Sequence, residues 1–204
     1  MIYNDIKSIN DYIDLLKISM KIFDCEIICL NSEICINSSS KDFIKIIHFI
    51  KDHPTTNFSL LIDICAVDYP ENKKRFEVIY NFLSVSQNLR LKLKLKVGIN
   101  ENVESISNIY SCSNWYEREI WDLFGISFSN HPDLRRILTD YDFEGYPLRK
   151  DFPLTGFVQV RYDNERKQVI NEPVKLDQEY RNFDNLSPWE GIIPELPGDK
   201  KKSV

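Results

Sequence analysis

Residues 58–97, FSLLIDICAVDYPENKKRFEVIYNFLSVSQNLRLKLKLKV, contain three runs with the character of β-strands. The first, residues 59–67, is apolar on both faces, which is typical of a central strand that is covered on both sides. The second, residues 76–83, alternates aromatic and aliphatic side chains after a turn. The third, residues 89–97, alternates leucine and lysine, which predicts one buried and one exposed face. The short loops between the runs predict an antiparallel meander.

Helical periodicity is found on both sides of these runs. Residues 1–20 carry apolar side chains every three or four positions and predict an amphipathic helix. Ser39, followed by Asp42, resembles a capping box and predicts the start of a second helix, which must end before Pro54. Residues 103–110 show similar spacing and predict another short helix.

The order of these elements indicates the fold class. Residues 25–31, CEIICLN, alternate like one more strand. We therefore predict an α+β fold with a mainly antiparallel sheet, helices packed on one side of it, and an irregular extended C-terminal tail. The predicted boundaries are 1–125 for the globular α+β domain, 126–163 for an irregular segment and 164–204 for the tail.

The five cysteines show no spacing typical of a metal site. They form no C-x-x-C pair and have no flanking histidines, which favours reduced thiols in a reducing compartment. Cys25, Cys29 and Cys35 are the candidates for an iron–sulfur cluster, but their spacing matches no common cluster motif. The strand pattern predicts small buried thiols instead. No metal site is therefore expected.

The composition limits the classes of function. The net charge of −5 disfavours a nucleic-acid partner, and the lysine face of residues 89–97 lacks aromatic residues for base stacking. No run of eighteen apolar residues is present, so no membrane span is predicted. The N-terminus resembles neither a secretory signal nor an imported presequence. Abundant Ile, Asn and Lys fit an AT-rich genome, such as that of an organelle.

The most distinctive stretch begins at Asn114 and reads NWYEREIWDLFGISFSNHPDLRRILTDYDFEGYPLRKDFPL. Apolar residues at helical spacing predict a helix over residues 114–124, with Asn114 as its cap and Gly125 as its end. Arg118 and Asp122 lie four residues apart and are placed to pair along the helix surface, which adds only about 0.3–0.5 kcal/mol. Stability alone therefore does not explain this density of charge.

Residues 126–163 are rich in proline and glycine, which predicts an ordered but irregular path. Basic and acidic side chains nearly cancel in charge, and aromatic residues lie between them. Such clusters are typical of protein interfaces. After Asp163 the chain lacks periodicity, and Phe183 and Trp189 predict a tail that becomes ordered across another protein.

Several motifs resemble the 30-kDa subunit family, or subunit 9, of respiratory complex I, NADH:ubiquinone oxidoreductase. They are EREIWDLFGISF, HPDLRRILTDYDFEGYPLRKDFPL, VRYD and EPVKLDQEYRNFDNLSPWE, with LIDICAVDYP and RFEVIYNFLS upstream. The resemblance covers about residues 58–190. The alternative is the equivalent subunit of a related bacterial or plastid NDH-type complex or of a membrane-bound hydrogenase. The LDQEYRNFDNLSPWE ending resembles the mitochondrial and proteobacterial branch, which disfavours the plastid and hydrogenase versions. Gln159 stands where members of the family usually have Glu, which puts one polar contact in doubt.

The resemblance implies a non-catalytic subunit of the hydrophilic arm that binds no cofactor itself. The whole complex uses FMN, iron–sulfur clusters, NADH and ubiquinone. The implied partners are the 49-kDa subunit of the quinone site and the subunit with the terminal iron–sulfur cluster. The implied location is the matrix side of the mitochondrial inner membrane, with the gene in the organelle. The alternative is the cytoplasmic face of a bacterial membrane.

Carried over residue by residue, the family signature implies a set of interface candidates. We expect some of them to make charge-assisted bonds within the fold or to a partner, above all Arg135, Arg136, Arg149 and Lys150. His131, which precedes Pro132, is expected to anchor a turn. The full set is Glu117, Arg118, Glu119, Asp122, Gly125, His131, Pro132, Asp133, Arg135, Arg136, Asp140, Gly145, Pro147, Arg149, Lys150, Asp151 and Pro153.

A free-standing enzyme is the alternative class of function. Glu117 and Glu119, together with His131, are the candidates for acid and base. On a helix, however, the two glutamates point in nearly opposite directions, and no nucleophile elbow, phosphate loop or dinucleotide fingerprint is present. No catalytic residues are therefore expected.

Overall fold

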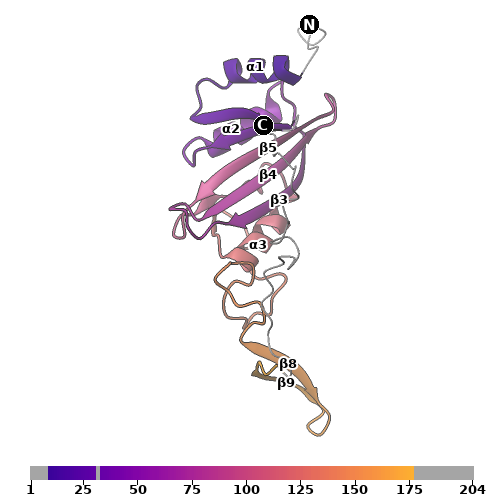
Figure 1. The fold of residues 1–204 in the computed structure, drawn as a ribbon. Coiled ribbons are helices and arrows are strands. Elements are labelled where there is room, and N and C mark those ends of the chain that lie inside the picture. Colours follow the sequence, from indigo (N-terminus) through magenta and orange to yellow (C-terminus); the bar gives the residue numbers. More distant parts are fainter. Residues whose placement is uncertain (1–8, 31–32, 177–204) are drawn as a thin grey trace, which may run out of the picture. The chain divides into compact units, whose positions relative to one another are not determined.

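The computed structural model describes residues 9–30 and 33–176, and these divide into two compact units between Gly156 and Phe157. Figure 1 shows the elements along the chain. The helices are α1 (Ile9–Ser19), α2 (Phe43–Asp52) and α3 (Ser113–Phe124). The strands of the first unit are β1 (Cys25–Leu30), β2 (Glu33–Ser38), β3 (Leu60–Asp68), β4 (Phe76–Ser84), β5 (Leu89–Val97), β6 (Val103–Glu104) and β7 (Phe128–Ser129), and those of the second are β8 (Val158–Asp163) and β9 (Gln168–Pro173).

The main sheet has the strand order β1-β2-β5-β4-β3. The antiparallel meander predicted over residues 58–97 is confirmed, because β4 pairs antiparallel with both β3 and β5. The sequence did not predict β2, which pairs antiparallel with β1 and parallel with β5. The sheet is therefore mixed but mainly antiparallel, as expected for the predicted α+β class.

The prediction of a central position for residues 59–67 is wrong, because β3 lies at the edge of the sheet. Helix α3 lies beside this strand (Figure 1) and bonds to its carbonyls. The Tyr116 hydroxyl donates to Ile62 O at 2.9 Å, and the Cys112 thiol donates to Leu61 O at 3.7 Å. Strand β3 is therefore contacted by β4 on one side and by α3 through two of its carbonyls.

All three helices contribute to a single core on one face of the sheet. Leu91, Leu93 and Leu95 of β5 are buried in this core, and Phe43 of α2 contacts Tyr80 of β4 with ring centroids 5.1 Å apart. On the opposite face, Lys94 pairs with Glu77 at 3.1 Å. The alternation read from residues 89–97 therefore assigns both faces correctly, and the helices cover one side of the sheet as predicted.

Three local predictions are wrong. Residues 103–110 form β6 and a turn in place of a helix, because the Val103 N–H bonds to Ser127 O at 2.9 Å and the Ser105 hydroxyl bonds to Ser107 at 2.9 Å. The capping box at Ser39 is absent, since Asp42 is the N-cap residue and makes no side-chain cap bond. Cys29 is exposed, although Cys35 is buried as expected.

The second unit contains a two-stranded antiparallel hairpin, β8–β9, in a region for which the sequence predicts no regular structure. The Asp163 carboxylate accepts the N–H groups of Glu165 and Arg166 and closes the turn. The predicted tail from residue 177 onward lies outside the described residues.

Candidate functional site

Helix α3 ends where the sequence predicts. Gly125 adopts φ 75°, and its N–H donates to Trp121 O at 2.9 Å. A Cβ atom at this position would lie 2.5 Å from Arg149 Nη2. The start of the helix differs from the prediction, because Cys112 and not Asn114 is the N-cap residue. The glycine therefore provides both the left-handed turn and the space for an arginine.

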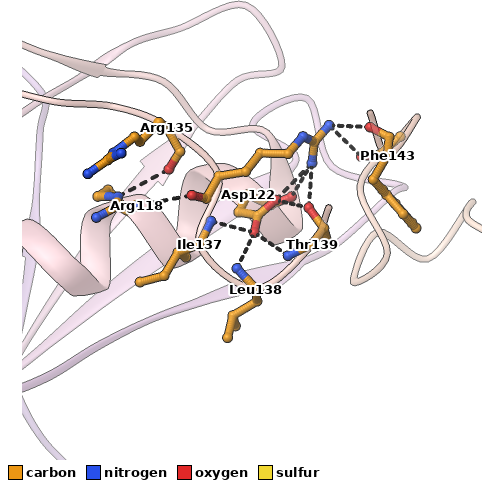
Figure 2. A network of polar contacts seen from close by, with 9 residues as sticks. Arg118, Asp122, Arg135, Ile137, Leu138, Thr139 and Phe143 are labelled. Atoms are coloured by element: carbon orange, nitrogen blue, oxygen red, sulfur yellow. Dashed lines mark hydrogen bonds and ion pairs between the residues drawn. The ribbon is translucent and has the colours of Figure 1, made fainter. Parts of the chain in front are cut away.

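Asp122 is the centre of a buried network that joins α3 to the segment after it (Figure 2). Its Oδ2 accepts the N–H groups of Ile137, Leu138 and Thr139 at 3.1, 2.8 and 2.9 Å. Its Oδ1 accepts Arg136 Nη1 at 2.8 Å and the Thr139 hydroxyl. Burial raises the pKa of Asp122, but these bonds outweigh it and hold the pKa below its usual range. The carboxylate is therefore an ionised structural anchor.

Arg136 is held by aromatic rings as well as by Asp122. Its guanidinium lies 5.8, 5.7 and 5.9 Å from the ring centroids of Trp121, Phe143 and Tyr146. Its Nη2 also donates to Phe143 O at 2.7 Å. The sequence did not identify this aromatic cage, although all three rings lie in the distinctive stretch. Arg136 is therefore bonded within the fold.

The predicted surface pair between Arg118 and Asp122 is absent, because both side chains are buried. Arg118 Nε donates to Arg135 O at 3.1 Å, and Arg118 Nη2 donates to Arg136 O at 3.0 Å. Its guanidinium also lies 5.1 Å from the Trp115 ring centroid. Arg118 therefore fixes the backbone of the following segment.

Glu117 and His131 are neighbours in the interior, with Oε2 and Nε2 separated by 3.9 Å. His131 Nδ1 accepts the Asp133 N–H at 3.1 Å, so its proton is on Nε2, which lies 3.1 Å from Asn114 O. This bonding makes His131 an anchor of the turn, as expected. Burial raises the pKa of Glu117, although the Ile106 N–H donates to its Oε1 at 2.8 Å.

Arg149 is the second arginine enclosed by this segment. Its Nε donates to Phe124 O at 2.5 Å, and its guanidinium lies 4.3 and 5.3 Å from the ring centroids of Tyr146 and Phe76. Because Phe76 belongs to β4, Arg149 ties the irregular segment to the main sheet.

Arg75 provides a further tie that the sequence analysis missed. Its Nε and Nη2 donate to the two carboxylate oxygens of Asp68 at 2.6 and 2.7 Å, and its Nη1 donates to Asp151 at 2.9 Å. The Lys150 N–H donates to Asp68 at 2.8 Å. The bond from Arg75 holds the pKa of Asp68 below its usual range. The only signal in the sequence is that Asp68 and Arg75 flank one turn.

The remaining signature residues divide by exposure. Asp133 and Arg135 form an ion pair at 2.9 Å with both side chains more than half exposed. Gly145 adopts φ 100°, where a Cβ atom would lie 2.8 Å from the Phe152 ring. Glu119, Pro147 and Pro153 are half-buried. The exposed signature residues are Pro132, Asp133, Arg135, Asp140, Gly145, Lys150 and Asp151.

Large apolar side chains are exposed beside these polar residues. They belong to α3 and to the segment that follows it, and they are Trp115, Leu138, Tyr141, Leu148 and Leu154. Exposed polar and aromatic groups of this kind are suited to contact with another protein. Within residues 9–30 and 33–176, no three His, Cys, Asp or Glu side chains come together as a metal site would require. No helix in this part of the chain is long and apolar enough to cross a membrane.

The chain is similar in sequence to one family of known proteins. Residues 36–158 match the family described as respiratory-chain NADH dehydrogenase, 30 Kd subunit. The NADH-quinone oxidoreductase C subunit of Sinorhizobium medicae (strain WSM419) is 55% identical over 169 residues, which cover 83% of this chain and 84% of that protein. The corresponding protein of Azorhizobium caulinodans is 52% identical over 171 residues, 84% of this chain and 81% of the relative.

A solved structure shows the same fold. A chain of the membrane-bound sulfane sulfur reductase, an archaeal respiratory membrane complex, superimposes with a TM-score of 0.59. The superposition covers 69% of this chain and 85% of the archaeal chain. The identity is 22%, so the likeness is one of fold alone.

Proposed function

The chain belongs to the family of 30-kDa subunits of respiratory-chain NADH dehydrogenases, and we propose that it is a non-catalytic core subunit of the hydrophilic arm of complex I. In this role it supports electron transfer from NADH to ubiquinone by holding other subunits in place. One observation carries the proposal. Asp122, Arg136 and Arg149 form their bonds within the chain, and these bonds give the irregular segment after α3 a fixed shape.

The proposed partners are the 49-kDa subunit of the quinone site and the subunit that carries the terminal iron–sulfur cluster. The exposed groups next to α3 support a protein partner, because Trp115 is 61% exposed and Tyr141 is 80% exposed. Aromatic side chains are enriched at protein interfaces. The enclosed arginines shape this surface, and the exposed residues are the ones available to a neighbour.

No catalytic residue and no cofactor of its own are proposed for this chain. FMN, iron–sulfur clusters, NADH and ubiquinone belong to the complex as a whole in this proposal. The acid–base alternative requires Glu117 and His131 to reach a substrate, and both side chains have 0% exposure. Their burial supports a structural role.

The bacterial relatives fit a location at the cytoplasmic face of a bacterial membrane. The mitochondrial location, on the matrix side of the inner membrane, gains no support from them and is based on residue composition and the C-terminal motif. In either location the chain is proposed to associate with the membrane through its partners.

Mass spectrometry of native gels from detergent-solubilised membranes tests the proposal. The chain is expected in a very large complex together with the other NADH-quinone oxidoreductase subunits. Its presence only as a free monomer would contradict the proposal. Co-migration with hydrogenase subunits would favour the related complexes that share this subunit.

A further inference from the structure

The hairpin β8–β9 has two faces of opposite character. Residues 158, 160 and 162 of β8 lie on one face, opposite residues 173, 171 and 169 of β9. Besides Asn171 and Pro173, this face carries Val158, Val160, Tyr162 and Val169, which are 59%, 61%, 56% and 64% exposed. We name these four residues the apolar strip.

On the other face, polar side chains bond to one another within the hairpin. Gln159 Nε2 donates to Glu172 Oε1 at 2.8 Å, and Arg161 Nε donates to the same oxygen at 3.2 Å. Ile170 lies opposite Arg161 in the register and is half-buried. The apolar strip is therefore the face of the hairpin whose burial against another surface would be favourable.

The hairpin is small for an independent structure. Two strands without a third are at most marginally stable in water, so a covering surface is expected to stabilise them. Its turn is nevertheless well defined, since Asp163 accepts two backbone N–H groups and Lys167 adopts φ 51°. The strip is therefore presented on a formed element.

The charges of the hairpin favour an uncharged protein surface as the occupant. The apolar strip contains no charged side chain, and the three basic residues Arg161, Arg166 and Lys167 are balanced by three acidic residues, Asp163, Glu165 and Glu172. A lipid surface or a nucleic acid would require an excess of basic residues. Exposed tyrosine and valine side chains instead match the apolar centre of a protein interface.

The area of the strip disfavours a second copy of this chain. Six residues rise about 3.3 Å each and two strands lie about 4.8 Å apart, so one face measures roughly 20 Å by 10 Å. Packing two such faces together would bury roughly 400 Å², well below the roughly 1,200 Å² of a stable interface. An area of this size is too small for a stable interface by itself. It is sufficient as one contact of a chain that binds its partners at other surfaces too.

We propose that the apolar strip of Val158, Val160, Tyr162 and Val169 docks on an uncharged, apolar surface of a different subunit of the same complex. This inference rests on the proposed function and adds a specific contact to it. The apolar strip belongs to the second compact unit, whereas the charged signature residues belong to the first.

Photo-crosslinking in the intact complex tests the docking face. A benzophenone amino acid replaces Val160 in one variant and Ile170 in a matched control, and the purified complex is irradiated and analysed by mass spectrometry. Position 160 is expected to crosslink to an identified sister subunit, and position 170 is not. Crosslinks from position 160 to residues 177–204 of the same chain, to a second copy, or to no protein would overturn the proposal.

A pair of substitutions provides an independent test. Val169→Asp places a charge on the apolar strip and is expected to weaken retention of the chain in the complex about tenfold. Ile170→Asp places the same charge opposite Arg161 and should leave retention unchanged. Equal loss from both variants, or from neither, would overturn the docking face. If the unmodified chain does not co-purify with the complex at all, the proposed function fails as well.

Discussion

Asp122 and Arg136 form a buried ion pair, with Oδ1 and Nη1 2.8 Å apart and the carboxylate side chain fully inaccessible. The two residues lie on α3 and on the irregular segment, so the pair determines how that segment folds back on the helix. The rings of Trp121 and Phe143 lie 5.8 and 5.7 Å from the Arg136 guanidinium and partly cover the pair. The buried signature charges thus stabilise the fold of this segment, and the proposed interface depends on the shape that they impose.

The substitution Asp122→Ala tests this ion pair. It leaves Arg136 and three backbone N–H groups without their acceptor, so the free energy of unfolding is expected to fall by about 3–5 kcal/mol. Urea unfolding measures the loss. The control Asp133→Ala removes an exposed pair with Arg135 and is expected to cost less than about 1 kcal/mol. Equal losses would show that Asp122 is no anchor.

Gly125→Ala tests the close approach between α3 and Arg149. Gly156→Ala is the matched control, since Gly156 also has a positive φ, 68°, but nothing lies within 4 Å of its Cβ position. The control is expected to cost about 1–2 kcal/mol for the left-handed conformation alone. Gly125→Ala should cost clearly more because of the clash with Arg149 and Tyr146. Thermal unfolding compares the two, and equal shifts in Tm would argue against the close contact.

Glu117→Gln tests the buried carboxyl group by its pH dependence. Burial raises the pKa of Glu117, so the folded protein holds this proton more strongly than the unfolded chain does. The associated stability is fully present below the unfolded value of about 4.3 and is lost as the pH rises through the folded pKa. The glutamine variant does not ionise, so its stability relative to the unmodified chain should rise as the pH increases above the unfolded value of about 4.3. A difference that does not change with pH would rule this out.

Arg75→Lys tests the tie between the sheet and the irregular segment. Lysine keeps the charge but loses the paired bonds to Asp68, which is expected to cost about 1.5–3 kcal/mol. Limited proteolysis should then cut the segment around Asp151 faster than in the unmodified chain. Lys74→Met is the control, because the Lys74 contacts are exposed: an ion pair with Glu101 and a bond to Lys96 O at 3.4 Å. Unchanged cleavage in the Arg75 variant would show that the tie is dispensable.

Truncation after Leu154 tests whether the C-terminal part holds partners. The first compact unit ends at Gly156, so the main sheet is expected to stay folded by circular dichroism. The amount of assembled complex on native gels is expected to fall, because the hairpin and all later residues are lost. Normal assembly by the truncated chain would refute a role for this part in holding the partners.

The sequence predicted those features that depend on local periodicity. Leucine and lysine alternate in β5, and the pleat turns this alternation directly into a buried and an exposed face. Gly125 ends α3 because a left-handed residue is a local requirement of the cap. Such local patterns determine structure without depending on contacts to distant parts of the chain.

The features that were missed depend on contacts between distant residues. Both faces of β3 are apolar, a pattern that does not distinguish a central strand from an edge strand covered by a helix. Arg118 was expected to pair within its own helix, but its partners are carbonyls 17 and 18 residues away. Arg75 and Asp151 are 76 residues apart, so no local pattern joins them. Periodicity carries no information about these partners.

The turnover of NADH–quinone electron transfer per assembled complex tests the non-catalytic role most directly. Asp122→Ala and Val169→Asp are compared with the unmodified chain, and activity is divided by the amount of complex measured on the same native gel. Both variants should lower the amount of complex and leave the turnover of the remaining complex unchanged. A variant that assembles normally but transfers electrons more slowly would mean that this chain takes part in the chemistry itself.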